Sequence, residues 1–409
     1  MLGASAVLLP RVVRAQGAAR VVVVGGGFAG ATCARELQRT GDVAVTLVEA
    51  NPTFTACPLS NNVIAGLRDL REQQFGYEGL RRAGVAVVHQ SATRVDAQGR
   101  RVTLGDGTSL DYDRLVLAPG IDIRVDALRG YDEGAVEAMP HAWKAGEQTQ
   151  LLRRQLESME DGGTVVMSAP PNPFRCPPGP YERASLIAHY LKTKKPRSKL
   201  IVLDAKDSFS KQRLFQAAWK ELYPGLIEWV SQSEGGRVTS VEPATKTFVT
   251  DFGRHKAAVA NVIPPQRAGR LAEVAGVADR TGWCPVDPVS FESKLQPNIH
   301  VIGDAATMGA MPKSAFSANA QAKVCAAAVA ALLRGGQPIS PKLINTCYSL
   351  VAPDYGISVA GVYSPTSGQL ADVPGAGGVS PLEASRSFRS LEATYAQAWF
   401  QTITTEVFG

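Results

Sequence analysis

Short, strongly apolar stretches alternate with helical ones along the first part of the chain. Residues 20–24 are an arginine followed by four valines, and residues 43–48 are similarly apolar and β-branched. Runs this short and continuous predict strands buried on both faces of a parallel sheet. Residues 31–39 between them have a helical pattern, and residues 112–120 and 298–305 contain two further predicted strands. The order indicates an α/β fold.

A glycine motif joins the first predicted strand to its helix. Gly25, Gly27 and Gly30 satisfy the spacing G-x-G-x-x-G. The first glycine permits a tight turn, the second lets a pyrophosphate approach the backbone, and the third allows close packing of helix on strand. Glu49 ends the second strand, a little over 20 residues later, where an acid accepts hydrogen bonds from ribose hydroxyls. The pattern predicts a dinucleotide site, and the acid disfavours a 2′-phosphate.

Composition narrows the classes of function. The chain has 409 residues, a formal charge of +6, 45% hydrophobic and 20% charged residues, which indicates a soluble protein of two or three domains. The sequence contains no internal run of about 18 apolar residues, so we predict no membrane-spanning helix. The sequence also lacks a block of basic residues with interleaved aromatic residues, so nucleic acid is a poor candidate partner. Six cysteines without a CxxC or CxxCH motif, and five scattered histidines, predict neither a metal site nor a c-type haem on this chain.

The start of the chain has the pattern of a processed segment. Residues 1–10 are apolar, and Val13-Arg14-Ala15 places small residues at both positions that define a cleavage site. We expect residues 1–15 to be the remnant of a secretory signal, with a frayed N-terminal extension as the alternative. A signal implies an oxidising, periplasmic compartment in which cysteine pairs persist.

Two later strand ends resemble the other FAD motifs of a known flavoprotein class. Residues 112–120 end in Ala118-Pro119-Gly120, and residues 298–305 end in a turn that contains Gly303 and Asp304. With the glycine motif, they resemble the glutathione reductase type of flavoprotein, in which this aspartate contacts the ribitol–pyrophosphate region of FAD. The resemblance implies FAD and an α/β fold with two Rossmann-like, glutathione reductase-type dinucleotide-binding domains plus a C-terminal interface domain.

The second domain lacks the glycine turn that flavoproteins of this type use for NAD(P)H. The strand at residues 164–168 is present, but residues 169–173 are Ala-Pro-Pro-Asn-Pro. Proline has no N–H to donate and its φ is fixed, so this turn cannot cradle a phosphate. We therefore expect no nicotinamide site, and we note that Cys176 follows the strand end instead.

Further motifs resemble the flavoprotein subunit of flavocytochrome c sulfide dehydrogenase over essentially the whole chain. They are residues 56–61 (ACPLSN), 141–149 (HAWKAGEQT), 176–184 (CPPGPYERA), 263–269 (IPPQRAG), 282–287 (GWCPVD), 345–349 (NTCYS) and 407–409 (VFG). In that family the cysteine at the position of Cys57 holds FAD covalently through the flavin 8α-methyl group. Cysteines at the positions of Cys176 and Cys347 form a redox disulfide facing the flavin. Pro58 departs from the bulkier residue expected after Cys57.

The resemblance implies sulfide oxidation. Hydrosulfide attacks a disulfide sulfur and leaves a persulfide on one cysteine and a thiolate on the other; the residues do not indicate which cysteine takes the sulfur. Glu182, near the disulfide in the family, is predicted to manage a proton, with a surface acid paired to Arg183 as the alternative. Lys313, predicted at the N-terminus of the helix facing the flavin, would stabilise a negatively charged reduced flavin, with an exposed lysine as the alternative.

Three cysteines are left without a chemical role, and the chain is expected to divide into three domains. Cys33, Cys284 and Cys325 are predicted to be structural. We expect an FAD-binding domain at residues 16–130 and 272–335, an NADH-like domain without a nicotinamide site at 131–271, and a C-terminal domain at 336–409. Since this chain encodes no haem, the resemblance implies a separate c-type cytochrome subunit as acceptor. We predict its interface on the C-terminal domain, which is rich in aromatic residues expected to be exposed: Tyr348, Tyr355, Tyr363, Tyr395, Trp399 and Phe400. For Tyr395, Trp399 and Phe400 the alternative is an amphipathic helix that packs on its own core, and the two interpretations are compatible.

Two other functions remain open. A sulfide:quinone oxidoreductase uses the same disulfide chemistry, but it needs an apolar quinone slot and an amphipathic membrane anchor. The terminal segment 394–409 has few apolar residues and no basic face, which disfavours such an anchor. A non-enzymatic redox-sensing flavoprotein is the second alternative.

Overall fold

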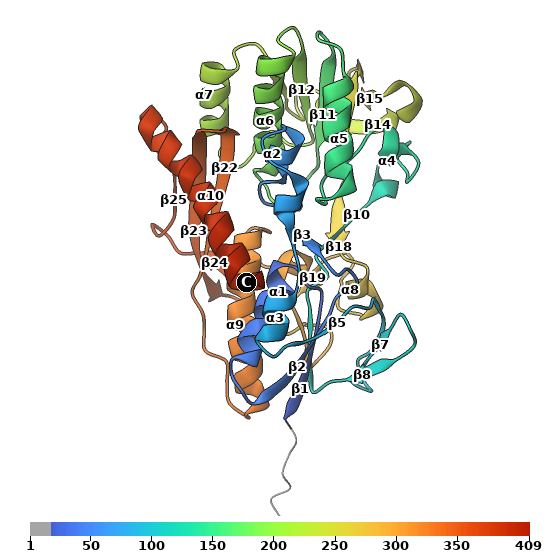
Figure 1. The fold of residues 1–409 in the computed structure, drawn as a ribbon, viewed down its shortest axis with the longest axis vertical. Coiled ribbons are helices and arrows are strands. Elements are labelled where there is room, and N and C mark those ends of the chain that lie inside the picture. Colours follow the sequence, from blue (N-terminus) through green and yellow to red (C-terminus); the bar gives the residue numbers. More distant parts are fainter. Residues whose placement is uncertain (1–17) are drawn as a thin grey trace, which may run out of the picture.

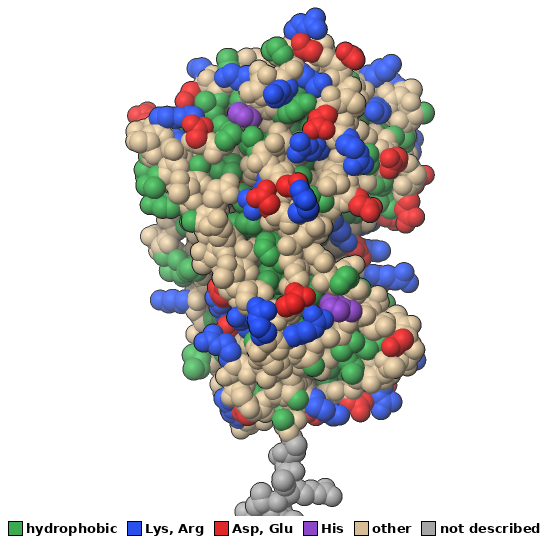
Figure 2. Space-filling model, in the orientation of Figure 1, with side chains coloured by type: hydrophobic (Ala, Val, Ile, Leu, Met, Phe, Trp, Pro, Cys, Tyr) green, Lys and Arg blue, Asp and Glu red, His purple; other side chains and the backbone are tan. Residues whose placement is uncertain are grey.

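The computed structural model describes residues 18–409 and has two stacked lobes, with the C-terminal part of the chain along one flank of both (Figure 1). The predicted signal remnant at residues 1–15 lies outside the described residues. Basic and acidic side chains are interspersed on the face shown in Figure 2.

The first lobe is built on a five-stranded parallel sheet in the order β20-β9-β1-β2-β5. Its strands are β1 (Ala19–Val24), β2 (Val43–Val48), β5 (Ala86–Val88), β9 (Arg114–Leu117) and β20 (Ile299–Val301). Helices α1 (Phe28–Gln38) and α9 (Ala315–Leu333) pack against each other. The predicted strand–helix–strand order is confirmed, as is the burial of the valine strand.

The helix after the glycine motif begins earlier than its sequence pattern predicted. It starts at Phe28, inside the motif, because Gly27 is its N-cap in an extended conformation. The strands β9 and β20 are shorter than the predicted stretches, and the turns at Ala118–Gly120 and Gly303–Asp304 follow them. Because β1, β9 and β20 are parallel neighbours, all three turns meet at the same edge of the sheet.

The second lobe contains a four-stranded parallel sheet in the order β13-β12-β11-β17. Its strands are β11 (Thr164–Ala169), β12 (Lys199–Asp204), β13 (Ile227–Val230) and β17 (Val259–Val262), and its helices are α5 (Glu147–Ser158), α6 (Gly179–Lys194) and α7 (Gln212–Leu222). An antiparallel pair, β10 (Ile121–Ile123) and β18 (Gln266–Ala268), lies where the chain passes between the lobes. The two Rossmann-like domains expected from the sequence are present.

The C-terminal segment is an antiparallel sheet covered by a long helix. Its elements are β22 (Leu343–Ala352), β23 (Tyr355–Thr366), β24 (Gln369–Asp372), β25 (Gly378–Val379) and α10 (Arg386–Phe408). Helix α10 packs on β23 and runs down to α1 (Figure 1). At its end, Phe408 stacks on Phe54 and Phe75, and Arg35 donates a hydrogen bond to the Gly409 carbonyl at 2.8 Å.

The predicted exposure of the C-terminal aromatics is wrong for half of them. Tyr355, Tyr363 and Phe400 are buried, because α10 closes over the sheet. Tyr395 is exposed, and Tyr348 and Trp399 are partly buried. An interface with a partner can therefore use only part of this set.

Among the described residues, α9 is the one helix whose length and composition suit a membrane span. It is an alanine-rich helix, and 56% of its apolar window is buried inside the protein, against α1 and β22. Its apolar residues are explained by this packing in the core of the protein. Cys33 and Cys325 are both fully buried on α1 and α9, in keeping with their predicted structural role.

Short elements complete the lobes. They are β3 (Phe54–Thr55), α2 (Ser60–Ile64), β4 (Gln74–Phe75), α3 (Glu78–Arg82), β6 (Ala92–Asp96), β7 (Arg101–Leu104), β8 (Ser109–Asp111), α4 (Ala135–Ala138), β14 (Val238–Glu242), β15 (Thr247–Thr250), β16 (Arg254–Lys256), α8 (Leu271–Val274), β19 (Cys284–Pro285) and β21 (Ala306–Thr307). Single-turn 3-10 helices occupy Leu70–Gln73, Val125–Ala127, Pro243–Thr245 and Gly303–Ala305.

Candidate active site

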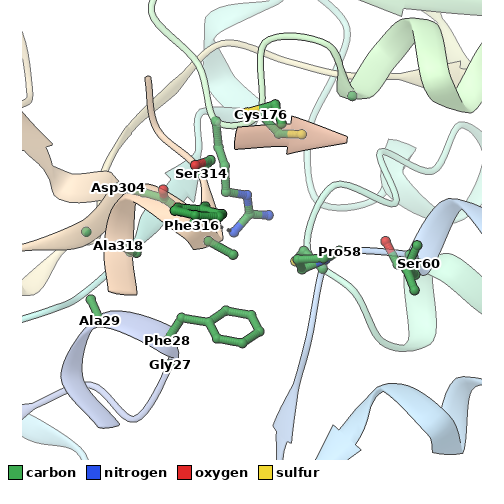
Figure 3. A pocket seen from close by; sticks show the side chains of 18 of the residues that line it. Gly27, Phe28, Ala29, Pro58, Ser60, Cys176, Asp304, Ser314, Phe316 and Ala318 are labelled. Atoms are coloured by element: carbon green, nitrogen blue, oxygen red, sulfur yellow. Dashed lines mark ion pairs between the residues drawn. The ribbon is translucent and has the colours of Figure 1, made fainter. Parts of the chain in front are cut away.

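One pocket collects residues from both lobes and from the C-terminal segment (Figure 3). The start of α1 forms its floor in that view, the turn around Asp304 and the start of α9 form one side, the segment after β3 forms the other, and Cys176 lies above. The lining includes Cys57, Cys176, Cys347 and Glu182. Four predicted site residues from three widely separated segments of the sequence thus meet at one cavity.

The glycine turn at the pocket edge has the shape of a phosphate cradle. Gly25 has φ of 104°, and a Cβ on Gly30 would lie 1.8 Å from the Gly25 carbonyl oxygen, so only glycine fits there. Gly27 lines the pocket directly. The Glu49 carboxylate accepts a hydrogen bond from the Gly26 N–H at 2.7 Å, which places the acid beside the turn. Predicted ribose and pyrophosphate contacts are therefore adjacent.

Asp304 also has the features of a cofactor contact. Its side chain is partly buried, and its buried Oδ1 atom has no hydrogen-bond partner among the described residues. An unpaired buried carboxylate oxygen is costly, so a hydroxyl donor from a bound cofactor would satisfy it. Burial raises the pKa of this carboxyl, while Arg175, whose Nη1 lies 3.8 Å from Oδ2, opposes the shift. Ala118, Gly120 and Gly303 line the same pocket, so this chain fits FAD.

Cys57 lies opposite the Asp304 turn, in the loop after β3. Its side chain is partly buried and lines the pocket, and its Sγ lies 4.0 Å from the Trp143 carbonyl oxygen. Pro58, the departure noted in the sequence, lines the pocket too. Nothing in this arrangement tests the covalent bond, which stays a prediction.

A buried arginine holds the loop that faces Cys57. Arg183 donates hydrogen bonds to the carbonyl oxygens of His141 and Ala142 and to the side chain of Asn61, and its guanidinium lies 4.9 Å from the centre of the Trp143 ring. It is 2% exposed. The alternative prediction of a surface pair between Glu182 and Arg183 is therefore wrong, since α6 buries both side chains.

Cys176 lies on the loop between β11 and α6, where a nicotinamide-binding domain would have its glycine turn. Its backbone has φ of 58°, an unusual value for a residue other than glycine. Its N–H donates to the Lys313 carbonyl at 2.8 Å, and its own carbonyl accepts from the Gly179 N–H. Burial raises the pKa of the Cys176 thiol. The proline-rich stretch thus presents a thiol to the pocket.

Cys347 reaches the same pocket from β22. It is 8% exposed, and its Sγ accepts a hydrogen bond from Asn345 Nδ2 at 3.3 Å. All six cysteines are free thiols in this structure, so the predicted bridge between Cys176 and Cys347 is not formed here. Their shared cavity agrees with the pairing, and the bridge itself stays a prediction.

Glu182 is a buried acid within this pocket. Its Oε1 accepts from the Leu350 N–H at 2.9 Å and its Oε2 accepts from Asn61 Nδ2 at 2.8 Å. Burial raises the pKa of the carboxyl, and these hydrogen bonds and the nearby Lys211 and Arg183 oppose the shift. Its place beside the cysteines agrees with the predicted proton role.

Lys313 lies at the N-terminus of α9, as the sequence predicted. It precedes Ser314, the N-cap of α9, and does not line the pocket. Its ammonium donates to the carbonyl oxygens of Asp304 and Ala306 at 2.8 and 2.7 Å and lies 3.9 Å from the centre of the Trp283 ring. Burial lowers its pKa to about 8. In this structure Lys313 holds the Asp304 turn and is partly buried, so the alternative of an exposed lysine is wrong. Its action on a reduced flavin stays a prediction.

Three polar residues escaped the sequence analysis, two that line the pocket and one beside Cys347. Arg175 lines the cavity directly before Cys176, Asn61 follows Cys57 by four residues, and Asn345 precedes Cys347 by two. Only their closeness to the candidate cysteines marked them, and polar residues near a cysteine are common in any sequence. The described residues contain no group of three or more His, Cys, Asp or Glu side chains placed to hold a metal ion.

Comparison with known proteins assigns this chain to a family. Residues 149–264 match the family model for the sulfide dehydrogenase [flavocytochrome c] flavoprotein chain, central domain, and residues 339–408 match the flavin-binding domain of flavocytochrome c sulphide dehydrogenase. Residues 19–159 match pyridine nucleotide-disulphide oxidoreductase. The chain belongs to the flavocytochrome c sulfide dehydrogenase flavoproteins, within the FAD-dependent disulfide oxidoreductases. It is a sulfide-oxidising flavoprotein.

Individual relatives share the superfamily. The chain is 22% identical to the mitochondrial sulfide:quinone oxidoreductase of Mus musculus over 342 residues, 78% of this chain and 72% of the relative. The structure of the sulfide:quinone oxidoreductase from Aquifex aeolicus superposes with a TM-score of 0.72 at 17% identity, covering 95% of this chain and 92% of that one. Putidaredoxin reductase in its covalent complex with putidaredoxin superposes with a TM-score of 0.66 at 19% identity, covering 96% and 94%. These structures establish the shared fold.

Proposed function

We propose that this flavoprotein oxidises hydrosulfide to sulfur or polysulfide through a disulfide between Cys176 and Cys347, with FAD held covalently at Cys57, and passes the electrons to a separate c-type cytochrome subunit in the periplasm. The observation that carries the proposal is the convergence of all three cysteines and Glu182 on the pocket that contains the FAD-binding turns. Electrons would enter at the thiols and leave through the cofactor without a nicotinamide.

The chemistry at the thiols needs no external oxidant in its first step. Hydrosulfide attacks one sulfur of the disulfide, the new sulfur–sulfur bond forms as the old one breaks, and the second cysteine leaves as a thiolate with the bonding electron pair. Glu182, whose raised pKa suits a carboxyl that gains and loses a proton, would take the proton of the bound sulfur species. Bound FAD would be able to accept two electrons together and to pass them on one at a time.

The loop after β11 supports an electron source other than NADH. The strand ends at Ala169, and nine residues separate it from α6, which begins at Gly179. Prolines at 170, 171 and 173 remove the N–H donors that a phosphate needs, and Lys206 donates its ammonium to the Pro170 carbonyl. The loop therefore lacks a phosphate-binding turn and instead carries Cys176 into the pocket.

The surface of α10 supports a protein partner at the C-terminal segment. Phe388, Leu391 and Tyr395 are 39%, 45% and 48% exposed and lie at helical spacing on one face. One turn further, Trp399 lines the pocket and stacks on Phe316, which also lines it. A partner on this face would lie next to the cavity.

A sulfide:quinone oxidoreductase is the second candidate, because the matched relatives from mouse and from A. aeolicus carry that name. It uses the same thiols and differs in its electron acceptor. The same apolar face of α10 would then face a membrane.

An anaerobic titration with sulfide tests the function and separates the acceptors. We expect sulfide at micromolar concentration to bleach the flavin, and the reduced protein to reduce a c-type cytochrome much faster than a soluble ubiquinone analogue. Faster reduction of the quinone would support the second candidate. Near-normal turnover in both Cys176→Ser and Cys347→Ser would refute the disulfide chemistry.

A further inference from the structure

The two candidate redox sulfurs have unequal surroundings. Cys347 Sγ accepts a hydrogen bond from Asn345 Nδ2 at 3.3 Å, whereas no described residue donates a hydrogen bond to the sulfur of Cys176. Cys347 is 8% exposed, and Cys176 is the more exposed of the two. This difference bears on which sulfur departs when the bridge between them opens.

The sequence of β22 places the amide beside the thiol. Asn345 and Cys347 are two residues apart on one strand, so their side chains point to the same face. In the register of the sheet, Asn345 lies opposite Gly361, which has no side chain, and Cys347 lies opposite Val359. The amide is 2% exposed.

Two serines at the start of α9 orient this amide. Ser314 and Ser317 both donate their hydroxyl hydrogens to Asn345 Oδ1, at 2.6 and 3.1 Å. Ser314 Oγ already accepts the Ser317 N–H as the helix N-cap, which leaves its hydrogen free to donate. With its oxygen held by the two serines, the amide places Nδ2 nearer to the Cys347 sulfur, at 3.3 Å, than Oδ1, at 3.8 Å.

A buried ammonium adds positive charge behind the same strand. Lys211 Nζ donates to the Cys347 carbonyl and to Ser349 Oγ, both at 2.8 Å. Its side chain is buried, and no salt bridge to it is found among the described residues. Burial lowers the pKa of this ammonium to about 8, and the nearby Cys347, Glu182 and Cys176 oppose the shift.

We infer that the oriented amide of Asn345 stabilises Cys347 as a thiolate, so that Cys347 is the leaving sulfur and Cys176 receives the incoming one. In the step, hydrosulfide sulfur bonds to Cys176 Sγ, the bond between the two cysteine sulfurs breaks, and Cys347 keeps its electron pair. The hydrosulfide proton stays on the terminal sulfur of the new persulfide. Hydrogen bonds to a charged acceptor are stronger than those to a neutral one, so the amide favours this direction.

The attack of hydrosulfide on Cys176 requires the disulfide of the proposed function. The stabilisation of the Cys347 thiolate by the Asn345 amide does not require it. The first measurement therefore uses the reduced holoenzyme without sulfide. Methyl methanethiosulfonate, a small thiolate-selective reagent, is applied over a range of pH, and labelling of each cysteine is followed by peptide mass. Asn345→Leu should slow the labelling of Cys347 at pH 7 by about tenfold or more, since a hydrogen bond to a charged group is lost, and move its pH profile upward.

A second variant and a matched control separate this effect from misfolding. Asn345→Asp keeps the shape and the acceptor for Ser314 and Ser317 but turns an oxygen toward the sulfur, so it should slow labelling of Cys347 at least as much. Asn319→Leu removes another buried amide, which lies on α9 and donates a hydrogen bond to Thr32 Oγ1 instead of a cysteine; it should leave labelling within about twofold. Equal slowing in Asn319→Leu, or no slowing in either Asn345 variant, would overturn the inference.

A second measurement follows the sulfur itself. One equivalent of sulfide is added to the oxidised holoenzyme, the products are alkylated at once, and the peptides are weighed. The extra sulfur should be on Cys176, and its recovery on Cys347 would overturn the assignment of the leaving sulfur. If no persulfide forms while the labelling difference persists, the proposed sulfide chemistry fails and the action of Asn345 on Cys347 stands.

Discussion

Glu182 Oε1 accepts a hydrogen bond from the backbone N–H of Leu350 at 2.9 Å, across 168 residues of sequence. The contact joins α6 of the second lobe to β22, the strand that carries Cys347. Since α6 begins directly after the Cys176 loop, one buried carboxylate helps to hold the elements of both cysteines together. The same side chain is the predicted proton acceptor.

Replacing this acid should slow the chemistry more than it disturbs the fold. Glu182→Gln keeps the size of the side chain and an oxygen for the Leu350 N–H, but it removes the group that exchanges a proton. We expect sulfide-dependent flavin reduction to fall by about 10²-fold or more, measured by anaerobic stopped flow. Because burial raises the pKa of this carboxyl, the wild-type rate should rise with pH as the acid ionises, and this limb should be absent in the variant. An unchanged rate and pH profile would assign Glu182 a structural role alone.

Cys57 should determine whether the flavin survives denaturation. The wild-type protein should stay yellow after acid precipitation, and Cys57→Ser should release its flavin into the supernatant, as measured by absorbance near 450 nm. Reduction by dithionite before precipitation should still bleach both proteins. Complete loss of colour from the precipitated wild-type protein would contradict the covalent link.

NADH should neither bind well nor reduce the flavin. The reason is the turn at residues 169–173, whose prolines remove N–H donors from the position of the phosphate cradle. The measurement is flavin absorbance after anaerobic addition of NADH, with dithionite as the positive control. Rapid bleaching by NADH would show that a nicotinamide site lies elsewhere on the chain.

His141 should make the protein sensitive to acid. Burial, with the nearby Arg183, lowers its pKa from 6.5 to about 4, and its Nδ1 accepts a hydrogen bond from the Trp143 N–H at 2.9 Å. Between these two pH values the unfolded chain binds the proton and the folded chain does not, so the free energy of unfolding falls as the pH falls. The loss is about 3 kcal/mol by pH 4.

The matched variants for this effect are His141→Asn and His255→Asn. In His141→Asn the new amide oxygen would still accept from the Trp143 N–H without taking a proton, so urea unfolding between pH 6.5 and 4 should depend less on pH. His255 lies on β16 between exposed Arg254 and Lys256, and its replacement should leave the wild-type pH dependence. The same slope in wild type and His141→Asn would locate the acid sensitivity elsewhere, with buried His300 as the next residue to replace.

The local pattern of the chain was enough for the nucleotide-binding lobe. Val21–Val24, the glycine turn and the later turns at Gly120 and Asp304 were all predicted from short motifs, because each depends on backbone conformation and burial within a few residues. Parallel strands then place these turns at one edge without further information. The first turn of α1 was missed, since an N-cap in the extended conformation leaves little trace in a glycine-rich sequence.

The tertiary structure decided what surrounds the thiols. Sequence named Cys176 and Cys347 through a family resemblance, but their common pocket arises only when α6 and β22 pack together. The burial of Glu182 and the orientation of Asn345 by the serines of α9 depend on contacts between segments 28 to 168 residues apart. Such contacts set charge and hydrogen bonding at a sulfur, and they carry no periodicity or motif along the chain, so folding alone determines them.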